Sequence, residues 1–211
     1  MGRLLYAAAV SAVICGPAAA GQAEPRATIQ GELPGDLRDS IERVVGATDR
    51  PIENRFEARR RARAAAEDAI AVLRSQGYYA YVVEPDVSEA DPPRPVVKVT
   101  PGARFRLAEP NIAWQGEQPD ADSQAAARSA LDLMPGAPGR AADVVAAEGR
   151  LVATLQGRGY ADVVSEPREV IVDHADLTVR PTYRIASGRL VRLDGIDLTP
   201  GVRTNPAWIR R

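Results

Sequence analysis

The sequence contains one cysteine, Cys15, and one histidine, His174, among its 211 residues. Cys15 lies in an apolar stretch near the N-terminus that we expect to be removed, which leaves no thiol for a disulfide bond. With one histidine and no remaining cysteine, neither a catalytic triad nor a cluster of histidine and cysteine metal ligands can be built. These absences argue against an enzyme, and we expect no cofactor and no bound metal.

A strong excess of charge of one sign is also absent. The 27 Lys and Arg residues nearly balance the 28 Asp and Glu residues, and the formal net charge is -1. Composition therefore gives no reason to expect a nucleic-acid partner. The densest charge cluster mixes both signs: Arg59, Arg60, Arg61 and Arg63 with Glu57 and Glu67. Such a cluster could contact lipid headgroups or an acidic partner, but a solvated helix face is the favoured interpretation.

Long apolar runs are missing too. The apolar stretch from Leu4 to Cys15 is shorter than the roughly 20 residues that span a membrane. It follows Arg3 and precedes the small residues Ala18–Ala20, which is the order of a secretory signal. We expect residues 1–23 to be a signal peptide and the protein to be exported. The alternative is an uncleaved anchor.

The strongest positive feature is an internal repeat. The stretch LRSQGYYAYVVEP at 73–85 and the stretch LQGRGYADVVSEP at 155–167 lie 82 positions apart and agree at six of thirteen positions. Towards the N-terminus of both, apolar residues recur at helical spacing, which predicts the buried stripe of an amphipathic helix. The two stripes are Ala62, Ala65, Ala69, Ile70 and Leu73, and Val144, Ala147, Leu151, Val152 and Leu155.

Strands and shorter helices surround each long helix. The long helix is predicted to end at Gly77 or Gly159, because glycine adopts the left-handed C-terminal conformation at little cost. A short strand follows, and then an alternating one at 95–101 or 177–185. A shorter helix precedes each long one. Its apolar positions are Leu37, Ile41 and Val44 in the first copy, and Ala127, Ala130, Leu131 and Met134, behind a cap at Asp122-Ser123, in the second.

The order of elements is therefore strand, helix, helix, strand, strand, and it occurs twice. This order predicts an α+β fold of tandem β-α-α-β-β domains, each a three-stranded sheet backed by two helices. We expect a first domain at 26–103, a second at 104–188, and the truncated start of a third at 189–211. A unit of this size is large enough to close a small core of its own.

This order, with a Gly-Tyr pair at the second strand of each copy, resembles the polypeptide-transport-associated (POTRA) domain. The GYY of 77–79 and the PGARFR of 101–106 most resemble the TamA branch of the BamA/TamA outer-membrane assembly superfamily. The resemblance covers essentially all of the chain after the expected signal peptide. In that family POTRA domains precede a β-barrel, so the resemblance implies a chain that is truncated before its barrel.

The resemblance also implies a function. It places the protein at the periplasmic face of the outer membrane, in the assembly or translocation of other proteins. The implied partners are a TamB-like inner-membrane-anchored protein, unfolded outer-membrane protein clients and, through the missing C-terminal barrel, the outer membrane itself. Nucleic acid is not among them. The alternatives are a freestanding periplasmic POTRA scaffold without a barrel and the POTRA region of a two-partner secretion transporter.

Candidate binding residues lie at the edges of the expected sheets. An edge strand has unpaired backbone N–H and C=O groups and can accept an extended segment by β-augmentation. By resemblance to POTRA domains, the edge is the second strand, at 78–84 and 160–166. The candidates are Tyr78, Tyr79, Ala80, Tyr81, Val82 and Val83, and Tyr160, Ala161, Asp162, Val163 and Val164. We expect proline at Val82 and Val164 to abolish binding without unfolding the protein.

Two of these patterns have a second interpretation. Tyr78, Tyr79 and Tyr160 follow a helix-ending glycine, where an apolar neighbour packs against the helix end, and this structural role is favoured over binding. Asp173, His174 and Asp176 could hold a metal ion, but a solvated turn between two strands is the favoured interpretation.

Overall fold

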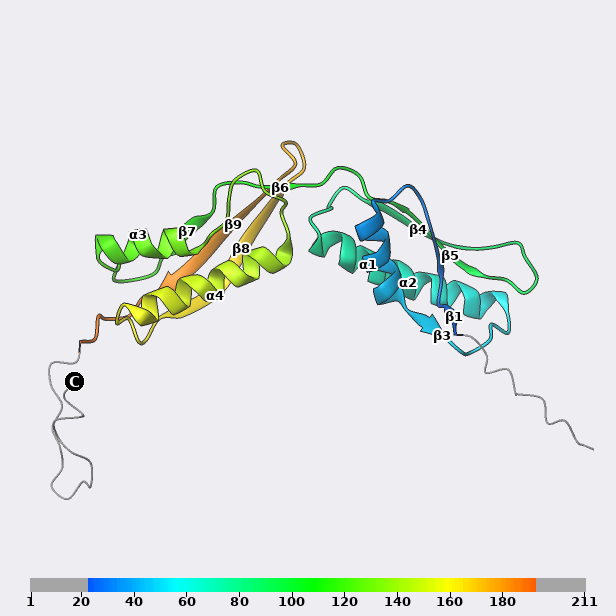
Figure 1. Cartoon of the computed structure of the whole chain (residues 1–211), viewed down its shortest axis with the longest axis horizontal. Coiled ribbons are helices and arrows are strands. Elements are labelled where there is room, and N and C mark those ends of the chain that lie inside the picture. The colour runs from blue at the N-terminus through cyan, green and yellow to red at the C-terminus, as the bar shows by residue number, and fades with distance from the viewer. Residues whose placement is uncertain (1–22, 193–211) are drawn as a thin grey trace, which may run out of the picture.

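The structure, a computed structural model, describes residues 23–192. Residues 1–22 of the expected signal peptide and residues 193–211 of the expected third domain lie outside the described part. Two α+β units follow one another along the long axis of the molecule and are joined by the chain that leads from β5 to β6 (Figure 1). No helix within 23–192 has both the length and the apolar character needed to cross a membrane.

The first unit contains a three-stranded sheet and two helices. Its strands are β2 (Thr28–Gln30), β4 (Val82–Val87) and β5 (Pro95–Thr100), and its helices are α1 (Gly35–Val45) and α2 (Arg55–Ser75). β5 lies in the centre, parallel to β2 and antiparallel to β4. The two-residue strands β1 (Glu24–Pro25) and β3 (Ala47–Thr48) form a further small pair that the sequence patterns did not predict.

The second unit repeats this arrangement. Its helices are α3 (Ala121–Ala130) and α4 (Ala141–Gly157), and its strands are β6 (Arg106–Leu107), β7 (Asn111–Trp114), β8 (Val164–Asp173) and β9 (Thr178–Ala186). The central strand, β9, pairs in parallel with β6 and β7 and antiparallel with β8. β6 and β7 together take the place of the first strand. The predicted α+β fold with two β-α-α-β-β units is confirmed.

Both cores form where the predicted stripes meet the sheet. In α2 and α4 the side chains of Ala65, Leu73, Leu151 and Leu155 are fully buried, and they pack with alternate residues of the central strand such as Val97. Small corrections apply at the margins of the stripes. Ile70 and Val152 are half-buried, Leu177 lies exposed in the turn before β9, and Val45 takes the buried place predicted for Val44.

The shorter helix of the second unit differs more from its prediction. Its N-cap is Asp120, whose Oδ1 accepts the Ser123 N–H at 2.8 Å, and not the Asp122-Ser123 pair. The helix ends at Ala130, and Asp132 then adopts a positive φ of 46°. This turn redirects the chain, so Leu133 is buried in the core and Met134 is exposed.

The repeated corner after each long helix is a Schellman motif, in which a glycine with positive φ lets two N–H groups close on the last helical turn. Gly77 has a φ of 89° and Gly159 a φ of 99°. The next N–H, of Tyr78 or Tyr160, donates to the carbonyl of Leu73 or Leu155 at 2.9 and 3.1 Å. This turn occupies the four residues that follow the glycine, so β4 and β8 begin at Val82 and Val164, later than predicted.

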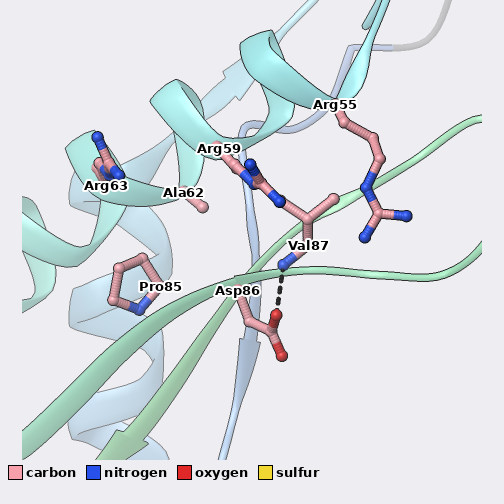
Figure 2. A pocket seen from close by; sticks show the side chains of 7 residues that line it. All are labelled: Arg55, Arg59, Ala62, Arg63, Pro85, Asp86 and Val87. Atoms are coloured by element: carbon pink, nitrogen blue, oxygen red, sulfur yellow. Dashed lines mark hydrogen bonds between the residues drawn. The ribbon is translucent and has the colours of Figure 1, made fainter.

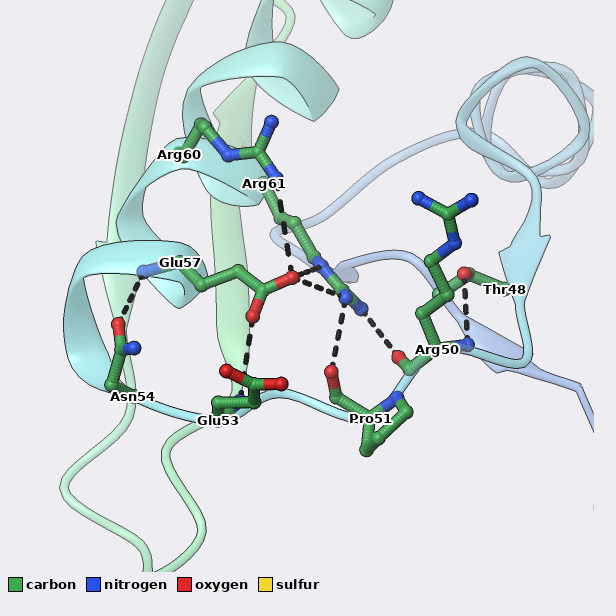
Figure 3. Close-up of polar contacts among 8 residues, drawn as sticks. All are labelled: Thr48, Arg50, Pro51, Glu53, Asn54, Glu57, Arg60 and Arg61. Atoms are coloured by element: carbon green, nitrogen blue, oxygen red, sulfur yellow. Dashed lines mark hydrogen bonds and ion pairs between the residues drawn. The ribbon is translucent and has the colours of Figure 1, made fainter.

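The start of α2 is held by polar contacts (Figure 3). Asn54 is the N-cap, and its Oδ1 accepts the Glu57 N–H at 2.9 Å. The guanidinium of Arg61 donates to Glu57 Oε1 at 2.6 Å and to the Arg50 and Pro51 carbonyls at 2.8 and 3.1 Å. The hydrogen bond from Arg61 is the main reason why the pKa of Glu57 is lowered. Arg61 therefore fixes the loop before the helix and does not belong to a free charged face.

Candidate functional site

The open edge of each sheet is the strand that follows the long helix. Within residues 23–192, β4 pairs with β5 alone and β8 pairs with β9 alone. In an antiparallel pair, alternate residues direct their N–H and C=O groups towards the partner strand and away from it. The residues that point away determine what an incoming segment can bind.

On β4 the residues pointing away are Val83, Pro85 and Val87. The Ser88 N–H donates to the Arg94 carbonyl at 2.9 Å, and in the register of this pair Glu84 and Asp86 share the orientation of Ser88 towards β5. Pro85 then has its nitrogen on the open side, where a proline costs no hydrogen bond of the ladder. The open edge of β4 therefore has no donor at its middle position.

The outward N–H of Val87, the last of the three outward residues of β4, already has a hydrogen-bond acceptor. Asp86 Oδ1 accepts the Val87 N–H at 2.8 Å (Figure 2). The other oxygen, Oδ2, accepts from Lys98 Nζ at 2.7 Å. The pKa of Asp86 is lowered, first by the hydrogen bond from Lys98 and then by that from the Val87 N–H. Only the Val83 N–H of β4 points outward without a proline or a side-chain acceptor in its place.

On β8 the edge is more accessible. The carbonyl groups of Leu177, Val179 and Ile185 accept from the N–H groups of Arg106, Ala108 and Gln115. These odd-numbered residues direct their backbone groups away from β8, so the backbone groups of the even-numbered residues of β9 point towards β8. The register then turns the backbone of Val170 and Val172 outward. Pro167 lies in an irregularity between Glu166 and Glu169, where a bulge tolerates it. The segment from Glu169 to Asp173 is thus a regular edge with two outward N–H groups.

The predicted edge residues lie in two different environments. Tyr78 to Tyr81 and Tyr160 to Val163 precede the strands, and only Val82, Val83 and Val164 lie within them. Val82 and Val164 pair with Thr100 and Ala186, and their backbone N–H and C=O groups point towards these partner strands. Proline at Val82 or Val164 would remove a hydrogen bond between the paired strands. These two substitutions would therefore disturb the fold and cannot test binding alone. Val83 and Val170 are the matching outward positions.

The tyrosines themselves pack against neighbouring elements. Tyr160 is buried, and its hydroxyl donates to Asp120 Oδ2 at 2.9 Å. Tyr78 lies 5.5 Å from the guanidinium carbon of Arg104, and Tyr79 meets Phe105 edge-on with ring centroids 5.3 Å apart. These contacts support the structural interpretation of the Gly-Tyr pair. The first unit also touches the second here, because the Phe105 N–H donates to the Gly77 carbonyl at 2.8 Å.

Comparison with known proteins identifies the first unit. Residues 26–101 match the family described as "POTRA domain TamA domain 1", a range that runs from just before β2 to just after β5. The first unit thus matches a POTRA domain of the TamA type. No curated protein matches the chain.

The solved structures that resemble the chain include further POTRA domains. POTRA3-5 of Haemophilus influenzae BamA is 17% identical, with a TM-score of 0.46 over 89% of this chain and 75% of that chain. POTRA1-2 of Omp85 from Anabaena is 16% identical, with a TM-score of 0.48 over 78% and 96%. POTRA1-3 of the same Omp85 is 14% identical, with a TM-score of 0.46 over 77% and 60%.

The single histidine of the sequence has a packing role in the second unit. His174 lies in the turn between β8 and β9, and its ring meets Phe105 edge-on with centroids 5.1 Å apart. Asp173 Oδ1 accepts the backbone N–H groups of Ala175 and Asp176 at 2.9 and 3.3 Å, which holds the turn. Within the described residues no group of three or more His, Cys, Asp and Glu side chains is placed to hold a metal ion.

Proposed function

We propose that this POTRA region belongs to a periplasmic assembly or translocation factor for outer-membrane proteins, and that it binds partner proteins and unfolded client segments by β-augmentation. The proposal includes export through a signal peptide at 1–23, domains at 26–103 and 104–188, and the start of a third at 189–211. A TamB-like inner-membrane-anchored protein is the proposed partner. The observation that carries the binding mode is the open edge in each unit, formed by β4 and β8.

The β8 edge is the better acceptor of the two. From Glu169 to Asp173 it offers the outward N–H and C=O groups of Val170 and Val172, whereas β4 has lost two of its three outward donors. The edge also offers accessible apolar side chains, one on each face: Val170 is 40% exposed and Ile171 is 50% exposed. An added strand would therefore gain both backbone hydrogen bonds and apolar contact.

The chemistry of this edge fits the proposed clients. Strands of outer-membrane proteins alternate apolar and polar residues over about 10 positions. A strand added to β8 would place its apolar face beside Val170 and Val172 and its polar face towards solvent. Because the backbone supplies most of the affinity, one edge can accept many different sequences, as a factor that handles many clients requires.

The test removes one outward N–H without disturbing the ladder. In V170P the proline nitrogen faces outward, so the β8–β9 hydrogen bonds are kept, while V170A keeps the N–H and is the matched control. The probe is a fluorescent peptide of about 10 residues that alternates valine and threonine between terminal lysines. Its affinity for the full chain is measured by fluorescence anisotropy.

We expect V170P to weaken binding about tenfold relative to V170A, since a lost backbone hydrogen bond contributes roughly 1 kcal/mol or more. The circular dichroism spectra and melting curves of the two variants should agree. Equal affinities of V170P and V170A for the peptide would overturn the proposal that β8 accepts strands.

A further inference from the structure

A basic groove runs between α2 and β4 (Figure 2). Its volume is about 220 Å³. One wall carries Arg55, Arg59 and Arg63, which follow one another at intervals of four residues and so share a helix face. Ala62 also lines the groove, and the other wall is formed by Pro85, Asp86 and Val87 of β4. The groove therefore follows the same edge strand that the proposed function concerns.

Two of the three arginines have no partner in the described part of the chain. The side chains of Arg59 and Arg63 make no hydrogen bond and no ion pair among residues 23–192, whereas the side chain of Arg55 pairs with Glu89 at 2.9 Å. Both members of that pair are largely exposed, so Arg55 can exchange its partner for a ligand. Like charges four residues apart destabilise a helix. Neither Arg59 nor Arg63 makes a side-chain contact that would offset this loss of stability.

The neighbouring arginines have other roles. Arg61 is almost fully buried and ties the Glu57 carboxylate to the loop before α2 (Figure 3). Arg60 lies 4.0 Å from the same carboxylate. The acidic residue of the strand wall is Asp86, and its carboxylate points away from α2 in Figure 2. There it forms an ion pair with Lys98 on the face of the sheet that is turned away from the helix. The groove thus keeps a net positive lining.

No free backbone N–H is offered to a ligand along this stretch of β4. Pro85 has no N–H and Asp86 accepts that of Val87, so the acceptor groups of a segment beside 85–87 must be bound by side chains. Guanidinium groups suit this role because their planar fork donates two parallel hydrogen bonds to a carboxylate. The three arginines stand directly above the part of the edge that lacks donors (Figure 2).

The second unit shows what the same fold has without these residues. At the 82-position offset of the repeat, Arg59 and Arg63 correspond to Ala141 and Val145. There Glu148 of α4 instead pairs with Arg168 and Ser165 of β8 and bridges helix and strand. The arginines of the first groove are therefore not a requirement of the fold.

We infer that the groove between α2 and β4 binds an extended acidic segment of a partner protein, whose carboxylates are held by Arg55, Arg59 and Arg63. The inference rests on the proposed function in taking the edge of a POTRA sheet as a binding surface, and it names the chemistry of the partner for the first unit. Phe56, which is 79% exposed, lies outside the groove and lines an adjoining hollow of α2 with Arg59 and Arg63. A concave groove suits a chain better than a flat bilayer.

The experiment compares two double variants of the full chain that remove the same charge. R59Q/R63Q empties the groove of its unpaired cations, and R43Q/R128Q removes two exposed arginines of α1 and α3. The probes are a fluorescent peptide that alternates Glu and Ser, its Gln-for-Glu analogue, the lysine-flanked Val/Thr peptide, and vesicles of phosphatidylglycerol or of phosphatidylcholine. Anisotropy measures peptide binding, and cosedimentation measures vesicle binding.

We expect the Glu/Ser peptide to bind the unchanged chain and R43Q/R128Q alike, and R59Q/R63Q about tenfold more weakly. The Gln analogue should bind all three weakly. Equal binding of the Glu/Ser peptide by both double variants overturns the inference, and so does phosphatidylglycerol binding that depends on Arg59 and Arg63 without peptide binding. The Val/Thr peptide has no side-chain carboxylates and reports on strand addition, so its binding separates failure of this inference from failure of the proposed function.

Discussion

The Tyr160 hydroxyl donates a hydrogen bond of 2.9 Å to Asp120 Oδ2, and the Asp120 N–H donates one of 3.0 Å to the same hydroxyl. This pair joins the corner after α4 to the N-cap of α3, two points 40 residues apart in sequence. Tyr160 is buried, so its polar atom must be satisfied within the protein. In the second unit the tyrosine of the Gly-Tyr pair, Tyr160, therefore stabilises the fold through its hydroxyl as well as its ring.

The first prediction concerns that hydroxyl. Y160F keeps the ring but leaves the Asp120 N–H without its acceptor, and we expect a loss of about 1–2 kcal/mol in the free energy of unfolding. The control is Y81F, whose hydroxyl accepts from Arg74 at 2.9 Å on the surface and should lose less than about 0.5 kcal/mol. Urea unfolding measures both. Similar losses in the two variants would mean that the link to Asp120 adds nothing.

The second prediction is acid sensitivity caused by Asp120. Its pKa is lowered from 3.8 to about 2, first by the Ser123 N–H and then by the hydroxyls of Tyr160 and Ser123. A lowered folded-state pKa means that the ionised carboxylate favours folding above about pH 4 and that this contribution disappears as the pH falls towards 2. In D120N this part of the decline should be missing. Melting temperatures of both proteins over this range give the answer, and parallel declines would contradict it.

The repeat explains how much of this architecture could be predicted. Helical spacing identified α2 and α4, and glycine located both helix ends, because these signals act within a few residues along the chain. The first residues of β4 and β8 were harder to predict. Gly77 and Gly159 each begin a four-residue corner, and the length of that corner depends on contacts such as Tyr160 with Asp120 that join distant parts of the sequence.

The candidate site depends even more on three-dimensional contacts. Sequence alone places Arg59, Arg61 and Arg63 in one charged cluster, yet Arg61 is buried against Glu57 and the other two line a groove. Nothing along the chain distinguishes them, because the loop that Arg61 fixes and the strand that faces Arg59 come from other segments. The outward direction of Val170 likewise follows from register, which a one-residue shift would reverse.

The third prediction is alkaline sensitivity caused by Tyr183. Burial raises the pKa of this tyrosine from 10.0 to about 12, and its hydroxyl donates to the Val144 carbonyl at 2.9 Å. A raised folded-state pKa means that its contribution is complete below pH 10 and is lost as the pH rises towards 12. Y183F should be less stable at neutral pH by about 1 kcal/mol but should lose less on the alkaline side. Urea midpoints across this range test the prediction, which fails if both proteins decline equally.

The fourth prediction contrasts two glycines. Gly149 lies inside α4, and a Cβ added there would meet nothing within 4 Å, so G149A should stabilise the protein by about 0.5–1 kcal/mol through helix propensity. Gly77 has a φ of 89°, and its added Cβ would lie 3.0 Å from the Gly139 carbonyl oxygen in the second unit. G77A should therefore destabilise by about 1–2 kcal/mol. Melting curves of the two variants decide the matter. A stable G77A would show that neither the Schellman turn nor the contact between the units requires glycine at this position.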